Sequence, residues 1–107
     1  IGQLDEAAAM ISDALGISDS APALWDTYGE ILMEQNKLGE ATAAFLKALS
    51  LEQHYPAATM NLARLYMSQG NTEAAVTLVN SLSDIMYDLS PDHREKLRDI
   101  RKQLGID

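Results

Sequence analysis

Cysteine is absent from the 107-residue chain, which excludes a disulfide framework, a thiolate metal site and a cysteine nucleophile. Basic residues are scarce, because eight Lys and Arg stand against 16 Asp and Glu and the formal net charge is -8. Such a chain is poorly matched to the polyanionic backbone of nucleic acid or to an anionic bilayer. No apolar run approaches the ~20 residues that a membrane-spanning helix needs. We therefore expect neither a nucleic-acid partner nor membrane insertion.

Side chains that carry chemistry are also sparse and dispersed. His54 and His93 are the two histidines, and neither lies at metal-ligand spacing from a second ligand on the same helix face. The six glycines are scattered instead of forming a phosphate-binding loop. Acidic pairs such as Glu30 and Glu34 are more typical of a solvated helix face than of an acid–base pair. The sequence predicts no enzyme, with no catalytic residues, no metal and no cofactor.

The remaining composition is that of one helical domain. Hydrophobic residues make up 47% of the chain, which is enough for a core, and the length suits a single domain. Ala and Leu are abundant, which favours helix. The chain begins at Ile1 and enters an amphipathic pattern almost at once, so we expect a domain cut from a longer protein.

The chain matches itself at an offset of 34 residues. Similar residues fall between the identities, and the offset persists over three successive segments without an insertion. This persistence indicates internal repeats, although no single identity would do so. The identical pairs are Pro22 and Pro56, Ala23 and Ala57, Met33 and Met67, Gln35 and Gln69, and Ala41 and Ala75.

Each repeat reads as two helices separated by a short break. Pro22 and Pro56 suit the first turn of a helix, because the N–H groups there are unpaired anyway. Breaks are predicted around Asn36 and Gly70, since both residue types tolerate the left-handed conformation that ends a helix. Thr72 is expected to cap the helix that follows. Besides the helices that begin at the two prolines, the predicted helices cover 3–15, 38–51, 72–86 and 91–104.

A helix–turn–helix repeat of this length resembles the tetratricopeptide family. In that family, small residues let helices approach closely and large residues fill the gaps between them. Thr59 and Leu82 depart from the pattern in the second repeat, where the family has a tryptophan and a small residue. RNA-binding helical repeats of similar length are a competing class, which the fixed offset and the acidic charge disfavour. The residues that fit the size classes in the first repeat are Trp25, Tyr28, Gly29, Leu32, Ala41, Phe45 and Ala48.

The resemblance implies an all-α fold, an α-solenoid of antiparallel helix pairs with about six helices wound into a right-handed superhelix. The last helix would end the stack with a polar surface, because terminal repeats must not stack end to end. The implied divisions of the single domain are 3–21 as the second half of a repeat, 22–55 and 56–89 as full repeats, and 90–105 as a capping helix.

The resemblance also implies a concave groove that holds a peptide or a segment of a partner protein. Its positions on this sequence carry an exposed acidic stripe, methionines that can repack against varied ligands, and a basic end. We therefore expect a charge gradient that suits a partner with both signs. The expected groove residues are Asp26, Thr27, Glu30, Met33, Met60, Asn61, Arg64, Met67, Arg94, Arg98 and Arg101.

Two competing interpretations apply to these groove residues. Charged helix faces are usually solvated, and methionines at helical spacing are more often core than contact. One branch of the family binds acidic chaperone tails through a clamp of Lys, Asn and Arg. Asn61 fits that clamp, but Asp26, Thr27 and Glu30 stand where it needs a base or an amide, so we do not expect chaperone-tail binding.

An alternative to ligand binding is a structural role within a longer array of repeats. The predicted helix 3–15 has the apolar face of a second helix but no first helix before it. Leu4, Ile11 and Leu15 are therefore expected to be partly uncovered, and exposed apolar strips tend to associate. This interpretation predicts self-association through the N-terminal helix and no ligand.

Overall fold

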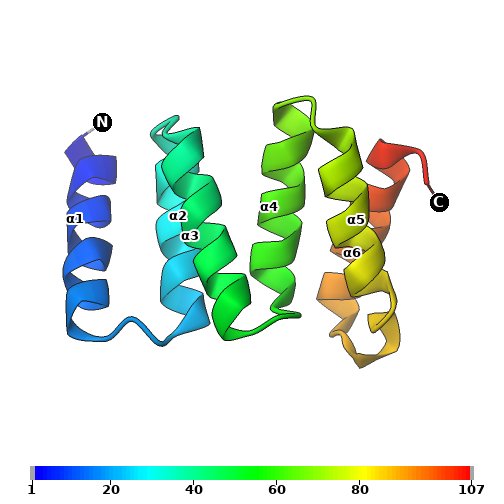
Figure 1. Cartoon of the computed structure of the whole chain (residues 1–107), viewed down its shortest axis with the longest axis horizontal. Coiled ribbons are helices and arrows are strands. Elements are labelled where there is room, and N and C mark those ends of the chain that lie inside the picture. Colours follow the sequence, from blue (N-terminus) through cyan, green and yellow to red (C-terminus); the bar gives the residue numbers. More distant parts are fainter. Residues whose placement is uncertain (1, 107) are drawn as a thin grey trace.

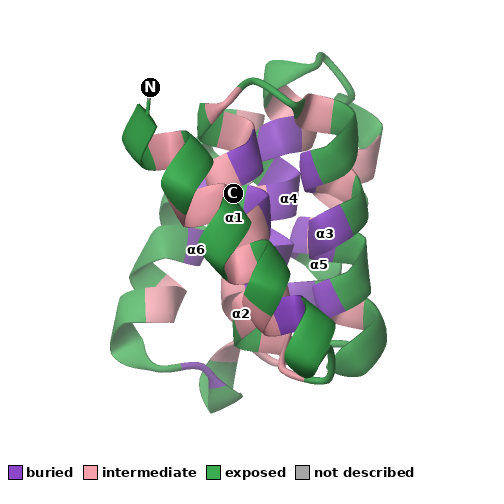
Figure 2. Cartoon of the chain, turned by 90° about the vertical axis from the view of Figure 1, so that its left-hand side faces the viewer, coloured by how far each residue is buried: buried purple, intermediate pink, exposed green. Residues whose placement is uncertain are grey.

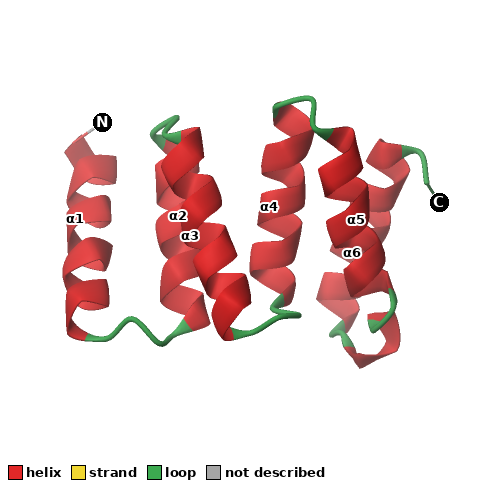
Figure 3. Ribbon diagram, viewed as in Figure 1, coloured by secondary structure: helices red, strands yellow, loops and turns green. Residues whose placement is uncertain are grey.

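The computed structural model describes residues 2–106, and these residues form a row of helices (Figure 1). Within that range there are six α-helices, one 3-10 turn and no strand, as Figure 3 shows. The all-α prediction is therefore confirmed. The elements are α1 (Gly2–Ile17), α2 (Pro22–Glu34), α3 (Leu38–Leu51), α4 (Pro56–Ser68), α5 (Thr72–Ser83), η1 (Met86–Asp88) and α6 (Pro91–Leu104).

Proline starts and left-handed residues set most of the helix boundaries. Proline stands in the first turn of α2, α4 and α6. Asn36 and Gly70 follow α2 and α4 with φ values of 61° and 77°, and Gly105 ends α6 with φ 72°. These are the conformations that asparagine and glycine tolerate best. The predicted breaks at Asn36 and Gly70 are confirmed.

Two local predictions about α5 are wrong. Asn71 is the N-cap, because its side-chain oxygen accepts a hydrogen bond from the backbone N–H of Ala74, whereas Thr72 is already the first helical residue. The helix also ends at Ser83 and not at residue 86. The backbone N–H of Ile85 bonds the carbonyl of Leu82, three residues back, which tightens the chain into the 3-10 turn.

The helices stack side by side as antiparallel neighbours. In Figure 1 the order along the long axis is α1, the pair α2 and α3, then α4, then α5 with α6, and the termini lie at opposite ends. The packed neighbours include α2 with α3, α3 with α4, and α4 with both α5 and α6. The molecule measures 39 × 27 × 21 Å, so it is extended along the stack.

The core consists of two clusters, the first formed by α2, α3 and α4 and the second by α4, α5 and α6. Phe45 is fully buried in the first cluster and lies directly against Gly29, where an added Cβ would come within 2.5 Å of its ring. Trp25 packs on the same cluster and contacts Tyr28 edge to face, with ring centroids 6.4 Å apart. The second cluster joins α4, α5 and α6 around Leu82 and Leu97. The small residues predicted to allow close helix contacts are buried here.

The N-terminal helix α1 is the least buried part of the stack. Figure 2 views the molecule from this end and shows α1 mainly exposed or half-buried. Leu4 and Ile11 are half-buried as expected, whereas Leu15 is buried. Met10 and Ile17 remain 71% and 89% exposed. Helix α1 therefore covers one side of α2 but leaves apolar side chains in solvent.

Candidate functional site

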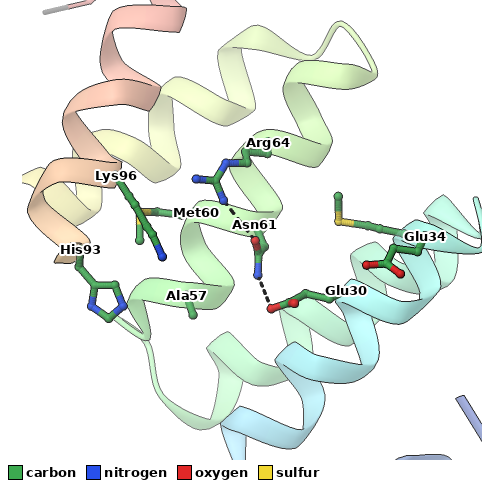
Figure 4. Close-up of a pocket in the computed structure, with 9 residues that line it drawn as sticks. Glu30, Glu34, Ala57, Met60, Asn61, Arg64, His93 and Lys96 are labelled. Carbon is green, nitrogen blue, oxygen red and sulfur yellow. Dashed lines mark hydrogen bonds between the residues drawn. The ribbon is translucent and has the colours of Figure 1, made fainter. Parts of the chain in front are cut away.

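A hollow of about 350 Å³ lies over α4, between α2 and α6 (Figure 4). We call it the three-helix groove. Three elements supply its walls, because α2, α4 and α6 are neighbours in space although they are far apart in sequence. Its lining residues are Glu30, Met33, Glu34, Ala57, Met60, Asn61, Arg64, His93 and Lys96.

The α2 side of the groove is acidic. Glu30 and Glu34 are exposed and lie one helical turn apart, so their carboxylates lie on the same face of α2. Figure 4 shows both side chains across the hollow from His93 and Lys96. This wall carries negative charge and lacks a basic residue of its own.

Asn61, a residue of α4, forms hydrogen bonds to the acidic side chains of α2. Its Nδ2 donates hydrogen bonds to Oδ1 of Asp26 at 3.0 Å and to Oε1 of Glu30 at 3.1 Å. Its Oδ1 accepts a longer bond from Nη1 of Arg64 at 3.4 Å. One amide therefore holds two carboxylates from α2 and orients the neighbouring guanidinium.

Asp26 is buried beneath this network, with 6% of its surface exposed. Burial raises the pKa of its carboxyl group from 3.8 to about 6, the Asn61 hydrogen bond opposes that rise, and the charge of Glu30 adds to it. The pKa of Tyr55 is also raised, first by burial and then by the charge of Asp26. The predicted exposed stripe is therefore wrong at Asp26, because α4 packs over that turn of α2.

The opposite side of the groove is basic. Arg64 comes from α4, and His93 and Lys96 come from the first turns of α6. Lys96 Nζ forms an exposed ion pair with Asp92 at 3.1 Å, an interaction of the kind that contributes little stability. Arg64 contacts no carboxylate within ion-pair distance among residues 2–106.

The floor between these two walls is apolar. Met33 and Ala57 are half-buried, and Met60 is 2% exposed. Met33 packs against the first core cluster and Met60 belongs to the second. Both methionines therefore line the groove and also take part in the core.

The structure brings together five of the eleven expected groove residues: Glu30, Met33, Met60, Asn61 and Arg64. Asp26 lies beneath them, Thr27 is exposed outside the hollow, and Met67 packs on the second cluster. On the last helix, Arg94 and Arg98 do not line the hollow. Arg101 points toward α5 and the chain end, where it donates to Asn80, Ser83 and the carbonyl of Ile106.

Lys96 was missed because α6 begins one residue later than a strict repeat predicts, and His93 was missed because its helix position was not expected to face the groove in either repeat. The starts Pro22 and Pro56 are 34 residues apart, whereas Pro91 follows 35 residues later. One residue turns a helix by about 100°, so the expected face of α6 is rotated away. The available signal was the buried pair Leu97 and Ile100, since the residues four positions before them are His93 and Lys96.

Residues 2–106 contain no group of three or more His, Asp or Glu side chains placed to hold a metal ion. None of the helices in that range combines the length and the apolar character that crossing a bilayer requires.

Comparison with protein families places most of this chain within a known repeat family. A family model described as tetratricopeptide repeat matches residues 32–97, which is more than half of the sequence. The match includes α3, α4 and α5 and the connections between them. A comparison with curated proteins found no match.

Proposed function

The chain belongs to the tetratricopeptide repeat family, and from that premise we propose that it is a protein-interaction module whose three-helix groove holds a peptide or a segment of a partner protein. Repeats of this family generally mediate protein–protein interaction. We propose no catalytic role for the chain, because the residues around the groove form no nucleophile and base arrangement.

The observation that carries the proposal is the composition of the groove. An apolar floor of Met33, Ala57 and Met60 lies between two polar walls, and three helices converge on it. An apolar centre with a polar rim is how interaction surfaces combine affinity with specificity. Methionine also adapts its shape to varied ligands.

Acidic chaperone tails are poor candidates for this groove. Asn61, the one residue that fits the clamp for such tails, already donates to Asp26 and Glu30. An acidic tail placed at this wall would meet the carboxylates of Glu30 and Glu34 and be repelled. The part of the ligand that faces Glu30 and Glu34 must therefore not be acidic.

Blocking the groove tests the proposal directly. A random dodecapeptide display library is selected against the protein, and enriched peptides are synthesised and measured by titration. Ala57→Trp places a large ring in the groove, so we expect binding to fall by at least about tenfold. Ala9→Trp is the matched control, because Ala9 is exposed on α1 outside the groove. Circular dichroism checks that both variants remain helical.

A second candidate function is self-association through α1. The observation in its favour is the exposure of Met10 and Ile17 on that helix. Analytical ultracentrifugation of wild type and of the Met10→Gln, Ile17→Gln double variant distinguishes the two functions. The structural role would be favoured by two results together. The wild-type protein would form oligomers that dissociate in this variant, and the display selection would yield no peptide that binds the groove.

A further inference from the structure

We infer that the three-helix groove recognises a bipolar partner segment, in which a basic side chain faces α2, apolar side chains cover the floor, and an acidic side chain faces α4 and α6. This inference rests on the proposed function and adds the chemical class of the ligand. The sequence already predicted a partner with both signs, and the folded chain adds which side chains form each wall of the hollow.

Among residues 2–106, no cation forms an ion pair with the carboxylates of the acidic wall. Glu30 and Glu34 lie one turn apart, and Asp26 lies one turn before Glu30, so three carboxyl groups share this face of α2. Like charges at this spacing repel one another. Within residues 2–106 the ion pair that forms joins Lys96 to Asp92, both on α6. A lysine or arginine of a ligand would supply the missing positive charge.

The hydrogen bonds of Asn61 beneath the acidic wall favour the binding of a basic ligand group at that wall. Asn61 brings the carboxylates of Asp26 and Glu30 to the same amide nitrogen, at 3.0 and 3.1 Å. The amide is a neutral donor, so it orients the carboxylates without cancelling their charge. Burial is the main cause that raises the pKa of Asp26, the Asn61 hydrogen bond lowers it, and the charge of Glu30 raises it further.

The basic wall is available to an acidic group. Arg64 is exposed and makes one long hydrogen bond to Asn61, at 3.4 Å. Lys96 can exchange its exposed Asp92 partner for a ligand carboxylate at little cost, because both side chains are more than half exposed. His93 lines the same side of the hollow. Figure 4 shows Arg64 and Lys96 reaching over the hollow from different helices.

The apolar floor separates the two charges of the ligand. Met60 and Ala57 lie on α4 between the walls, and Met33 lies on α2 beside Glu34. A ligand of single sign would leave one wall unbalanced and be repelled by the other wall. The order basic, apolar, acidic across the groove is therefore the pattern that satisfies both walls at once.

The test measures dodecapeptides selected on the wild-type protein against two variants in which one wall is neutralised by glutamine. Glu30→Gln with Glu34→Gln removes the acidic wall and leaves an acceptor for Asn61. Arg64→Gln with Lys96→Gln removes the basic wall. The matched controls change the same charge elsewhere on exposed positions, as Glu6→Gln with Asp13→Asn and Arg98→Gln with Lys102→Gln.

We expect peptides that are sensitive to Ala57→Trp to carry both signs, to lose about tenfold in affinity to each groove variant, and to bind both controls like wild type. Raising the salt concentration should weaken wild-type binding toward that of the variants. Groove-dependent peptides that are neutral or of single sign would overturn the bipolar ligand and leave the proposed function standing. If selection yields no peptide sensitive to Ala57→Trp, both proposals fail.

Discussion

The two full repeats place different chemistry on the same backbone plan. At equivalent positions of their first helices, α2 carries Asp26, Glu30 and Glu34, whereas α4 carries Met60, Arg64 and Ser68. The positions that face the interior change far less, since the pairs Tyr28 and Leu62, Leu32 and Tyr66, and Phe45 and Val79 stay apolar. Packing therefore constrains one face of each helix, and the other face is free to diverge into opposite walls of a groove.

The largest expected effect comes from truncating the buried apolar side chain that both repeats carry at the same position of their second helix. Phe45→Ala empties the centre of the first cluster, where Phe45 is fully buried, and should lower the free energy of unfolding by about 3–5 kcal/mol. Val79→Ala, at the equivalent position of the second repeat, removes fewer atoms and should cost less. Urea denaturation of both variants measures the difference. Equal losses would contradict the larger contribution that we assign to Phe45.

A smaller effect should follow from adding one methyl group where the repeats differ. Gly29 stands where the second repeat has Ala63, and a Cβ there would lie 2.5 Å from the Phe45 ring. Because the buried ring cannot move freely, Gly29→Ala should destabilise the fold by about 1–3 kcal/mol despite its better helix propensity.

The control for this prediction is a second helical glycine. Gly39 in α3 has no atom within 4 Å of an added Cβ. Gly39→Ala should therefore stabilise the protein by about 0.5–1 kcal/mol, because alanine lowers the conformational entropy that the unfolded chain loses on folding. Thermal unfolding of the two variants compares the signs, and stabilisation by Gly29→Ala would contradict the close contact.

The last effect depends on pH and concerns the buried carboxyl group that the second repeat lacks. Asp26 has a pKa of about 6 in the folded chain, against 3.8 for the ordinary group. The folded state therefore holds this proton over a pH range where the unfolded state has lost it. It follows that the contribution of Asp26 to the free energy of unfolding falls as the pH rises from about 4 to about 6.

Asp26→Asn removes this pH dependence and keeps the acceptor for Asn61. At pH 7 the variant should be about 1–3 kcal/mol more stable than wild type, and the advantage should disappear near pH 4. Urea denaturation at several pH values measures it, with Asp13→Asn on the exposed face of α1 as the control. A constant difference across the pH range would show that Asp26 does not titrate as described.

Much of the architecture was predictable because it depends on local signals. The proline starts, the left-handed residues Asn36 and Gly70, and the apolar spacing predicted every α-helix, with α1 and α5 differing by a few residues at their ends. The Asn71 cap was missed because asparagine and threonine are both good N-cap residues. Their order in the sequence does not decide which of them is the N-cap and which is the first residue of the helix.

The groove was predictable only in part. Glu30, Met33, Met60, Asn61 and Arg64 were found because α2 and α4 follow the strict repeat. The burial of Asp26 could not be predicted, since it depends on how closely α4 packs over α2. Lys96 was missed because one additional residue before α6 turns that helix relative to its neighbours, and His93 was missed because the repeat pattern places its position outside the groove.

The sequence by itself determined the helices, their pairing and the apolar face of each one, because these follow from propensities and periodicities within a few turns of chain. The tertiary structure alone decided which charged side chains meet across the groove and which carboxyl group lies beneath it. Those relations join residues about 30 to 65 positions apart, and they depend on the rotation of each helix against its neighbours, which no local pattern records.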